Sequence, residues 1–303
     1  MSSFSFVEKR KIFAIIVAVL LVVGLASFFI RGFNLDVDFV GGTTLQVEMK
    51  DYLSKTGESS ISTALEQELT DFIRSRSGAG IASFQRAANE SGLPTQFIVK
   101  TTELDTEARE ALYEALAEKY GISGGYVYSN NVGAAISGEL RSAAIVATVV
   151  AVALMLLYIT FRFDLSSGLA AVTCLAHDLF MMLAAYSLLQ IPMNGTMIAA
   201  LLTILGYSIN ATIIVFDRLR ENRRRSMEAN EAVDTSIRQT LTRSINTTIT
   251  TFVTIAALYV LGVTSIRQFA LPLMVGILAG LFSSVCLAGN LWNFYRKLFR
   301  KKV

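Results

Sequence analysis

The chain has 303 residues, of which 53% are hydrophobic and only 17% carry a charge, and its mean hydropathy is +0.51. This composition excludes an ordinary soluble domain and predicts a polytopic membrane protein. One histidine and two cysteines in apolar runs offer neither a disulfide framework nor a metal site, and the net charge of +3 gives no reason to expect a nucleic-acid partner.

Six apolar stretches are long enough to cross a lipid bilayer, which takes about 20 residues. In chain order, we expect spans at residues 12–30, 140–160, 165–189, 195–216, 244–262 and 269–294. The first span follows three basic residues, as in a signal peptide, but it is too long for one and has no clear cleavage site. We therefore predict that it is retained as an anchor.

The basic residues predict the orientation, because cytoplasmic loops are enriched in lysine and arginine. With the N-terminus inside, the inner segments hold 16 of the 27 basic residues, and the two short outer loops hold only Arg267. The inner residues are Lys9, Arg10, Lys11, Arg162, the seven arginines from Arg218 to Arg243, and Arg296, Lys297, Arg300, Lys301 and Lys302. Six spans then place both termini in the cytoplasm.

Residues 31–139 are expected to lie outside the membrane as a domain with 9 basic and 16 acidic residues, a net charge of −7. Its hydrophobic pattern predicts strands at 43–49, 81–87, 96–101 and 126–129, and helices at 61–74 and 106–119. The order β-α-β-β-α-β is that of a small α+β ferredoxin-like domain. The chain thus divides into residues 1–30, 31–139 and 140–303.

Several short motifs occur at defined positions in this topology. Residues 36–43 read DVDFVGGT after the first span, and His177-Asp178 lies in the third. Residues 206–222 read GYSINATIIVFDRLREN and place Asn210 in an apolar run, where a polar side chain is costly and usually faces other helices or water. Arg243, Asn246 and Thr247 open the fifth span. With these motifs in this order, essentially the whole chain resembles the SecF branch of the SecD/SecF family, within the resistance-nodulation-division group of proton-driven transporters.

The resemblance implies a function in the bacterial inner membrane. Family members pair with SecD, which supplies six further spans and a larger external domain. They assist the late export of unfolded polypeptides through the SecYEG channel, with YajC as a further partner. Protons, or sodium in some members, drive the movement, and no other cofactor or enzymatic activity is expected. The family motif also suggests a hinge or a SecD contact at Asp38, Phe39, Gly41 and Gly42.

One position departs from the family pattern. The family usually places a proton-carrying aspartate after the asparagine of the fourth-span motif, and this chain has Ala211 there, whether by lineage or by engineering. The resemblance implies that Arg243 faces this acid, so its partner here is Asp178, Asp217 or an acid of SecD, unless it is an interfacial anchor. Asp217 is expected to pair locally with Arg218.

Asp178 is then the main acid left inside a span. A carboxylate at mid-bilayer costs roughly 2.5–3.5 kcal/mol on insertion scales, so it pairs with a cation or takes up a proton. His177 points about 100° away on a helix and need not touch it. Asp178 is either an ion relay or a buried acid that fixes packing. The ion-relay candidates are Asp178, Arg243, Asn210 and His177.

Polar residues recur at helical spacing in the fourth and fifth spans. They are Tyr207 and Asn210 in the fourth, and Arg243, Thr247, Thr250 and Thr254 in the fifth. We expect the two faces to meet in the bundle interior and line a polar track, although small polar residues also hydrogen-bond between helices for packing alone.

The glycine pair at 41–42 most simply permits a tight turn, and Asp36 and Asp38 are expected to be exposed. No lysine or strand-to-helix context follows the pair, so it is not a phosphate loop.

Two other functions compete with an ion-driven export subunit. A small-molecule or lipid exporter of the same group would carry two six-span halves, and this chain has one. An ion-independent scaffold for SecD and the channel gains support from Ala211. The sequence does not favour an intramembrane enzyme, because it has no Ser/His/Asp set, no paired intramembrane acids and no HExxH motif.

Overall fold

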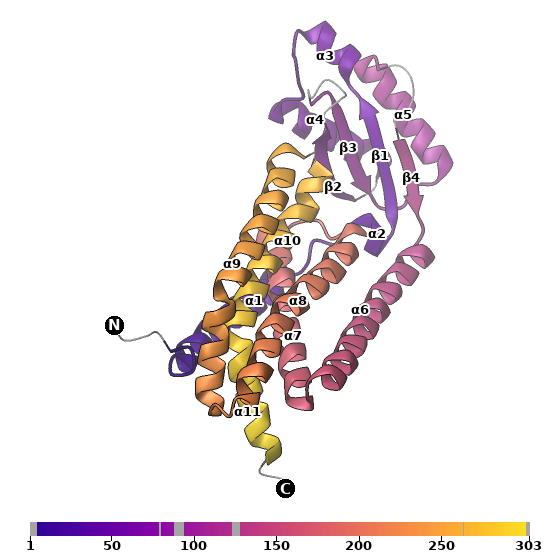
Figure 1. Ribbon diagram of the computed structural model, residues 1–303. Helices are drawn as coiled ribbons and strands as arrows, with labels where there is room; N and C mark the ends of the chain where they lie inside the picture. Colours follow the sequence, from indigo (N-terminus) through magenta and orange to yellow (C-terminus); the bar gives the residue numbers. More distant parts are fainter. Residues whose placement is uncertain (1–4, 79, 88–93, 123–127, 263, 301–303) are drawn as a thin grey trace. The chain divides into compact units, whose positions relative to one another are not determined.

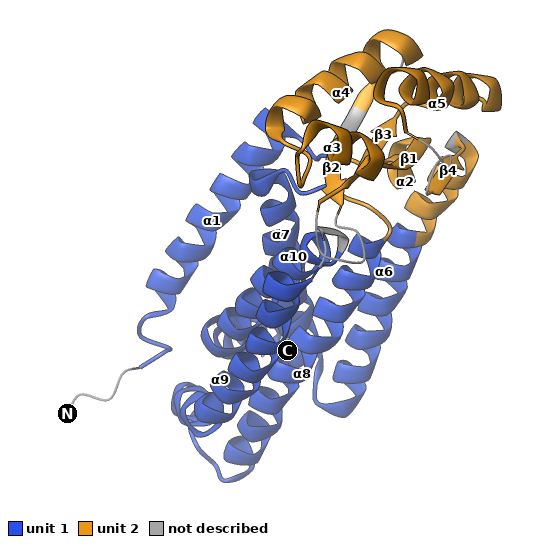
Figure 2. Ribbon diagram, turned by 90° about the horizontal axis from the view of Figure 1, so that it is seen from above, with its two compact units in different colours: residues 1–34, 144–192, 196–303 blue, residues 35–143, 193–195 orange. Residues whose placement is uncertain are grey.

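The computed structural model describes residues 5–78, 80–87, 94–122, 128–262 and 264–300 and falls into two compact units. Unit 1 comprises residues 1–34, 144–192 and 196–303, and unit 2 comprises residues 35–143 and 193–195 (Figure 2). The predicted basic residues Lys301 and Lys302 lie outside the described residues.

The six predicted membrane spans are all helical and apolar enough to cross a bilayer (Figure 1). The helices are α1 (Arg10–Arg31), α6 (Ala134–Arg162), α7 (Leu165–Leu189), α8 (Thr196–Arg224), α9 (Ala229–Leu261) and a last span built from α10 (Thr264–Phe282), the π-helical turn η1 (Ser283–Leu287) and α11 (Ala288–Arg300). The chain is therefore a multi-pass membrane protein.

The spans expected at 195–216 and 244–262 imply a long cytoplasmic loop between them. This prediction is wrong. α8 continues to Arg224 and α9 begins at Ala229, so only four residues connect the two helices. The first turns of α9 are helical because they bury Ala232, Val233 and Ile237 in the core of unit 1. Asn222 also donates a 2.8 Å hydrogen bond from Nδ2 to Ser236 Oγ, which ties the polar ends of the two helices together.

α7 is the central helix of unit 1. In its most apolar window 56% of the residues are buried, compared with 17% for α1 and 11% for α6. α1, α10 and α11 all pack against α7, and α10 also packs against α8 and α9. A side chain in the middle of α7 is therefore enclosed by protein.

The N-terminal segment lies at the same end of unit 1 as the α8–α9 turn. The Asp234 carboxylate of α9 accepts hydrogen bonds from the backbone N–H groups of Phe6 at 2.8 Å and Val7 at 3.0 Å. Asn290 of α11 donates to the Phe6 carbonyl at 3.3 Å. The common side predicted for the N-terminus, the loop arginines and the last helix is thus confirmed.

Unit 2 contains the predicted succession of strands and helices. The strands are β1 (Gly42–Glu48), β2 (Ile81–Ala87), β3 (Gln96–Thr101) and β4 (Tyr128–Val132), and the helices are α2 (Val37–Val40), α3 (Lys50–Thr56), α4 (Thr63–Ser77) and α5 (Thr106–Tyr120). The sheet order is β2-β3-β1-β4, with every pair antiparallel. Tyr126, where the last strand was expected to begin, lies outside the described residues. The ferredoxin-like classification stays a prediction.

Local sequence signals explain the two long helices of unit 2. Ser62 caps α4 and Asp105 caps α5, and left-handed glycines, Gly78 and Gly121, end them. Their apolar faces bury Leu69 and the residues around it against alternate side chains of β1 and β3. The helices therefore cover one face of the sheet.

Candidate ion-coupling site

Asp178 is fully buried in the middle of α7, with 0% of its surface exposed. Its Oδ2 atom accepts hydrogen bonds from Ser208 Oγ of α8 and, at 2.8 Å, from Ser283 Oγ of η1. Three helical elements therefore meet at one carboxyl group. Neither serine was identified from the sequence, although both interrupt apolar runs.

His177 contacts Asp178, a contact that the sequence left open. Its Nδ1 atom lies 2.8 Å from Asp178 Oδ1. The Cα–Cβ bonds of adjacent helical residues do diverge by about 100°, but an imidazole is long enough to turn back along the helix. His177 Nε2 is buried and has no hydrogen-bond partner among the described residues. The pair can therefore hold or exchange a proton at the Nδ1–Oδ1 contact.

The backbone beside Asp178 is adapted to the close approach of α8 and α10. A Cβ atom added to Gly280 of α10 would lie 3.2 Å from Ser208 Cβ, so this glycine leaves room for the serine. Immediately afterwards the helix widens into η1, which presents Ser283 to Asp178. Single π-turns inside α-helices occur frequently at functional sites.

The fourth- and fifth-span motifs also meet, at a second place. Tyr207 of α8 donates a 3.1 Å hydrogen bond from its hydroxyl to Thr248 Oγ1 of α9. A cavity of about 10 Å³, enough for roughly one water molecule, lies beside this bond. The cavity is lined by Tyr207, Asn210, Ala211, Ile214, Ser244, Thr247 and Thr248. The family's acid position, Ala211, therefore faces the fifth span.

The predicted burial of the polar track is wrong. Asn210, Thr247, Thr250 and Thr254 are exposed on the outer surface of unit 1. The threonines of α9 satisfy their own hydroxyl groups by bonding to backbone carbonyls one turn earlier, for example Thr254 to Thr250 at 2.9 Å. Because their donors are already paired, they do not need a neighbouring helix of this chain.

Arg243 is exposed and forms no ion pair among the described residues. It lines a cleft of about 460 Å³ that Asp217 and Glu221 also line. The local pair expected between Asp217 and Arg218 is wrong: Asp217 lies 3.7 Å from Arg162, and Arg218 pairs with Glu221. Arg218 pairs there because Glu221 is one helical turn away, on the same face of α8.

The DVDFVGGT motif makes contacts that stabilise the structure of unit 2. Asp36, expected to be exposed, is 3% exposed; it pairs with Lys100 of β3 and accepts a 2.7 Å bond from the Val37 N–H. Asp38 Oδ2 accepts a 2.8 Å bond from the backbone N–H of Gly195. Phe39 is buried. The motif therefore holds residues 193–195 in unit 2.

The two glycines of this motif are required by the backbone. Gly41 has φ +83° and Gly42 has φ +146°, values that other residues rarely adopt. A Cβ atom on Gly42 would lie 2.2 Å from the carbonyl oxygen of Thr101. The predicted tight turn is present, and the close approach of β1 to the end of β3 adds a second reason for glycine.

Comparison with known proteins explains why these motifs occur together. The family model for the protein export membrane protein SecD/SecF, C-terminal, matches residues 113–298, and the SecD/SecF GG motif matches residues 26–51. The chain belongs to the SecD/SecF family. The match runs from α5 into α11, so both polar sites described above lie within the SecD/SecF region.

Relatives within the SecD/SecF family are similar over nearly the whole chain. Protein translocase subunit SecF of Acidaminococcus fermentans is 34% identical over 99% of this chain and all of the relative. Protein translocase subunit SecDF of Thermus thermophilus is 36% identical, but this chain covers only 37% of its length. A crystal structure of SecDF, described as a translocon-associated membrane protein, from the same genus and species superposes with a TM-score of 0.81 at 33% identity, covering 97% of this chain and 39% of that one.

Proposed function

We propose that this SecD/SecF-family chain is an accessory subunit of the Sec protein-export machinery, driven by the transmembrane ion gradient. Its relatives are translocase subunits, and its fold matches SecDF over nearly all of its length. The observation that carries the ion coupling is the Asp178 carboxyl group, which is fully buried and linked to three helical elements. Protonation of such a group changes the hydrogen bonds that hold those helices together.

The energy available suits a conformational role. One elementary charge crossing the membrane releases about 2.3 kcal/mol per 100 mV. Serine hydroxyls donate to the ionised Asp178 carboxylate, whereas a protonated carboxyl group must donate its own hydrogen to one neighbour. The change therefore shifts which of Ser208 and Ser283 is bound most strongly, and with it the contact between α8 and η1.

SecD is the partner that the SecDF relatives suggest for this chain. Relatives named SecDF contain a region like this chain within a much longer one, so the two parts work together in those proteins. Here the exposed polar residues of α8 and α9 lie in membrane spans, where contact with lipid is unfavourable. Helices of SecD would cover this face and bring an acid to Arg243.

The proposed function also implies the other partners, the membrane and the coupling ion. The SecYEG channel, YajC and the emerging unfolded polypeptide are the other partners, in the bacterial inner membrane. We assign both termini to the cytoplasm, since Phe6 bonds to α9 and α11 near the basic α8–α9 turn and basic residues favour the cytoplasmic side. The coupling ion is a proton or sodium, and the chain has no catalytic activity of its own.

A scaffold function is the second candidate, and Ala211 favours it. This residue lines the α8–α9 cavity at the position of the family's acid and cannot carry an ion. In a scaffold, SecD would conduct the ion alone, and Asp178 would only fix helix packing.

The test is gradient-dependent export into membrane vesicles that contain SecD and the channel. We expect Asp178→Asn, which keeps the shape of the carboxyl group, to lose most of the gradient-dependent part of export. We expect Ala211→Asp to increase it. If export with Asp178→Asn and with Arg243→Gln equals wild type, the scaffold function is correct. Dissipating the proton and sodium gradients separately identifies the ion.

A further inference from the structure

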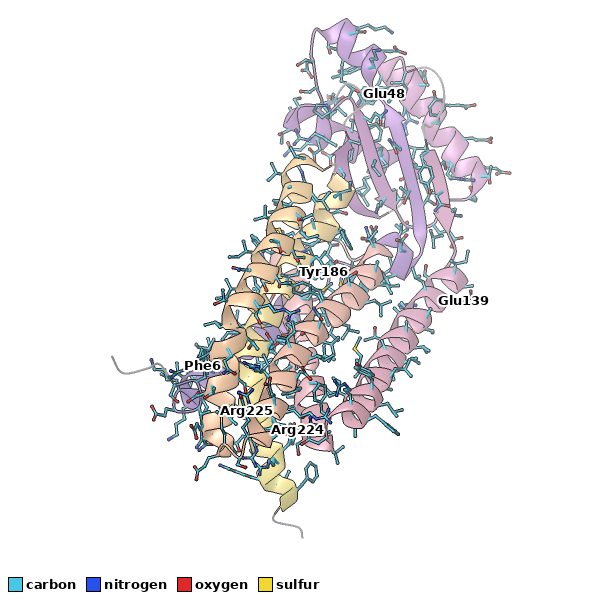
Figure 3. The ribbon with its side chains drawn as sticks, viewed as in Figure 1. Phe6, Glu48, Glu139, Tyr186, Arg224 and Arg225 are labelled. Carbon is cyan, nitrogen blue, oxygen red and sulfur yellow. The ribbon has the colours of Figure 1, made fainter. Side chains whose placement is uncertain are left out.

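The basic end of unit 1 contains a pocket of about 320 Å³ that the export function does not use. Its polar wall carries Arg220, Arg223 and Arg224 from the end of α8 and Arg296 from α11. We call it the basic pocket. Figure 3 shows Arg224 and Arg225 at the end of unit 1 where the last turns of α11 also lie.

The arginines that line the basic pocket outnumber its acidic residues. Arg220, Arg223 and Arg224 form no ion pair among the described residues, whereas their neighbours Arg218 and Arg225 both pair with Glu221. Four arginines and one acid leave the wall with a net charge of +3, and the acid is Asp164. It caps α7 by accepting a 2.7 Å bond from the Ser167 N–H, and Trp292 Nε1 lies 3.4 Å from its other oxygen.

Two of the arginines are held in place by backbone carbonyls. Arg220 donates to the carbonyl of Arg162 at 2.9 Å, and Arg223 donates to that of Met227. A guanidinium group has five N–H donors, so each arginine keeps several for a ligand. Fixed, clustered guanidinium groups bind phosphate well, because they present paired donors to its oxygens without further loss of side-chain freedom.

The basic pocket also has an apolar part. It contains Phe163, Phe216, Leu219 and Trp292, and the Arg296 guanidinium lies 5.3 Å from the centre of the Trp292 ring. α6 ends and α7 begins beside it, so the pocket lies where the apolar spans give way to charged residues. A free phosphate ion makes no use of an apolar surface. The glycerol and first methylene groups of a phospholipid, which lie at this depth of the membrane, pack against one.

From this combination we infer that the basic pocket binds the phosphate group of an anionic phospholipid. Phosphatidylglycerol and cardiolipin are lipids of this class. The volume lies at the lower end of small-molecule sites, roughly 300–1,000 Å³, and fits a headgroup. Basic pockets between membrane helices are suited to such headgroups. Bound lipid would neutralise the arginines and join α8 to α7 and α11, whether or not the chain couples ions.

The test is lipid retention by the purified full chain, measured by native mass spectrometry after exchange into equal mixtures of phosphatidylglycerol, cardiolipin and phosphatidylcholine. We expect anionic lipids to be retained over phosphatidylcholine, and the double variant Arg220→Gln with Arg224→Gln to retain them about tenfold less. The double variant Arg218→Gln with Arg225→Gln is the matched control, because it also removes two positive charges from the end of α8 and neither residue lines the pocket.

Three results would overturn the inference. They are equal loss of lipid in Arg218→Gln with Arg225→Gln, no preference for anionic lipid in the wild type, and displacement of the lipid by millimolar inorganic phosphate, which would identify a free-phosphate site. Thermal unfolding of the Arg220→Gln and Arg224→Gln double variant with phosphatidylcholine alone checks its fold. In phosphatidylcholine we expect this double variant to melt at the same temperature as the wild type. We expect anionic lipid to stabilise the wild type but not the double variant.

Discussion

Ser283 Oγ lies 2.8 Å from Asp178 Oδ2, across a separation of 105 residues in the chain. The hydroxyl group comes from a π-helical turn, and the carboxyl group comes from the middle of the most buried span. This contact joins the last span of unit 1 to its central helix. A change in the charge of Asp178 therefore acts directly on the position of η1.

Removing either serine hydroxyl should weaken ion coupling more than it weakens folding. Ser283→Ala and Ser208→Ala each leave Asp178 Oδ2 with one donor, a loss of about 1–2 kcal/mol. We expect a roughly fivefold or larger fall in gradient-dependent export. Ser284→Ala is the control, because Ser284 is equally buried but, within the described part of the chain, its hydroxyl bonds only to the Leu281 carbonyl. A similar loss in the control would point to disturbed packing.

Cysteines placed on either side of the α8–α9 cavity should form a cross-link. In a background with Cys174→Ala and Cys286→Ala, we expect Asn210→Cys with Thr247→Cys to react rapidly with a short bifunctional reagent, because both positions line the cavity. Gel mobility after cleavage of the connecting α8–α9 turn measures the yield. Asn210→Cys with Thr254→Cys should stay uncrosslinked, since Thr254 is about two helical turns further along α9. Equal yields would contradict the arrangement.

Breaking the Asp36–Lys100 pair should destabilise unit 2 strongly. The side chains are 1% and 14% exposed, so Lys100→Met leaves a buried carboxylate without its cation, at a cost of about 3–5 kcal/mol. Hydrogen exchange of the β1 and β3 amides in the full chain reports the loss. Lys119→Met is the control: it breaks an exposed pair with Glu68, which should cost less than about 1 kcal/mol. Similar protection in both variants would refute the structural role of Asp36.

The contact between α4 and α5 should respond to pH through Glu68. The hydrogen bond from Lys119 lowers the pKa of the Glu68 carboxyl group, and burial opposes this in part. Since the pKa is lower in the folded state, the contact stabilises unit 2 above the unfolded-state pKa and is lost as the pH falls through the folded-state pKa. The same bond raises the pKa of Lys119, so on the alkaline side the contribution is lost as the pH rises through that pKa.

Hydrogen exchange of α4 and α5, measured against pH, checks this effect. We expect protection to fall at acidic pH more steeply in the wild type than in Glu68→Gln. Because both groups are about half exposed, the difference should be small and should shrink as salt is added. Identical pH profiles would show that the pair contributes nothing.

The sequence by itself determined the six spans, the common side of the N-terminus and the basic loop, and the order of strands in unit 2. These features depend on local patterns: the length of apolar runs, the placement of basic residues, and alternation of period two or 3.6. The structure confirmed each of them.

Only the tertiary structure decided which polar groups meet. Ser208 and Ser283 reach Asp178 from 30 and 105 residues away, and Thr250 and Thr254 lie outside the bundle although their spacing is the same as that of a buried stripe. The early start of α9 depends on a core contributed by other helices. Periodicity identifies a helix face, but which face is covered depends on the packing of distant segments, which no local pattern encodes.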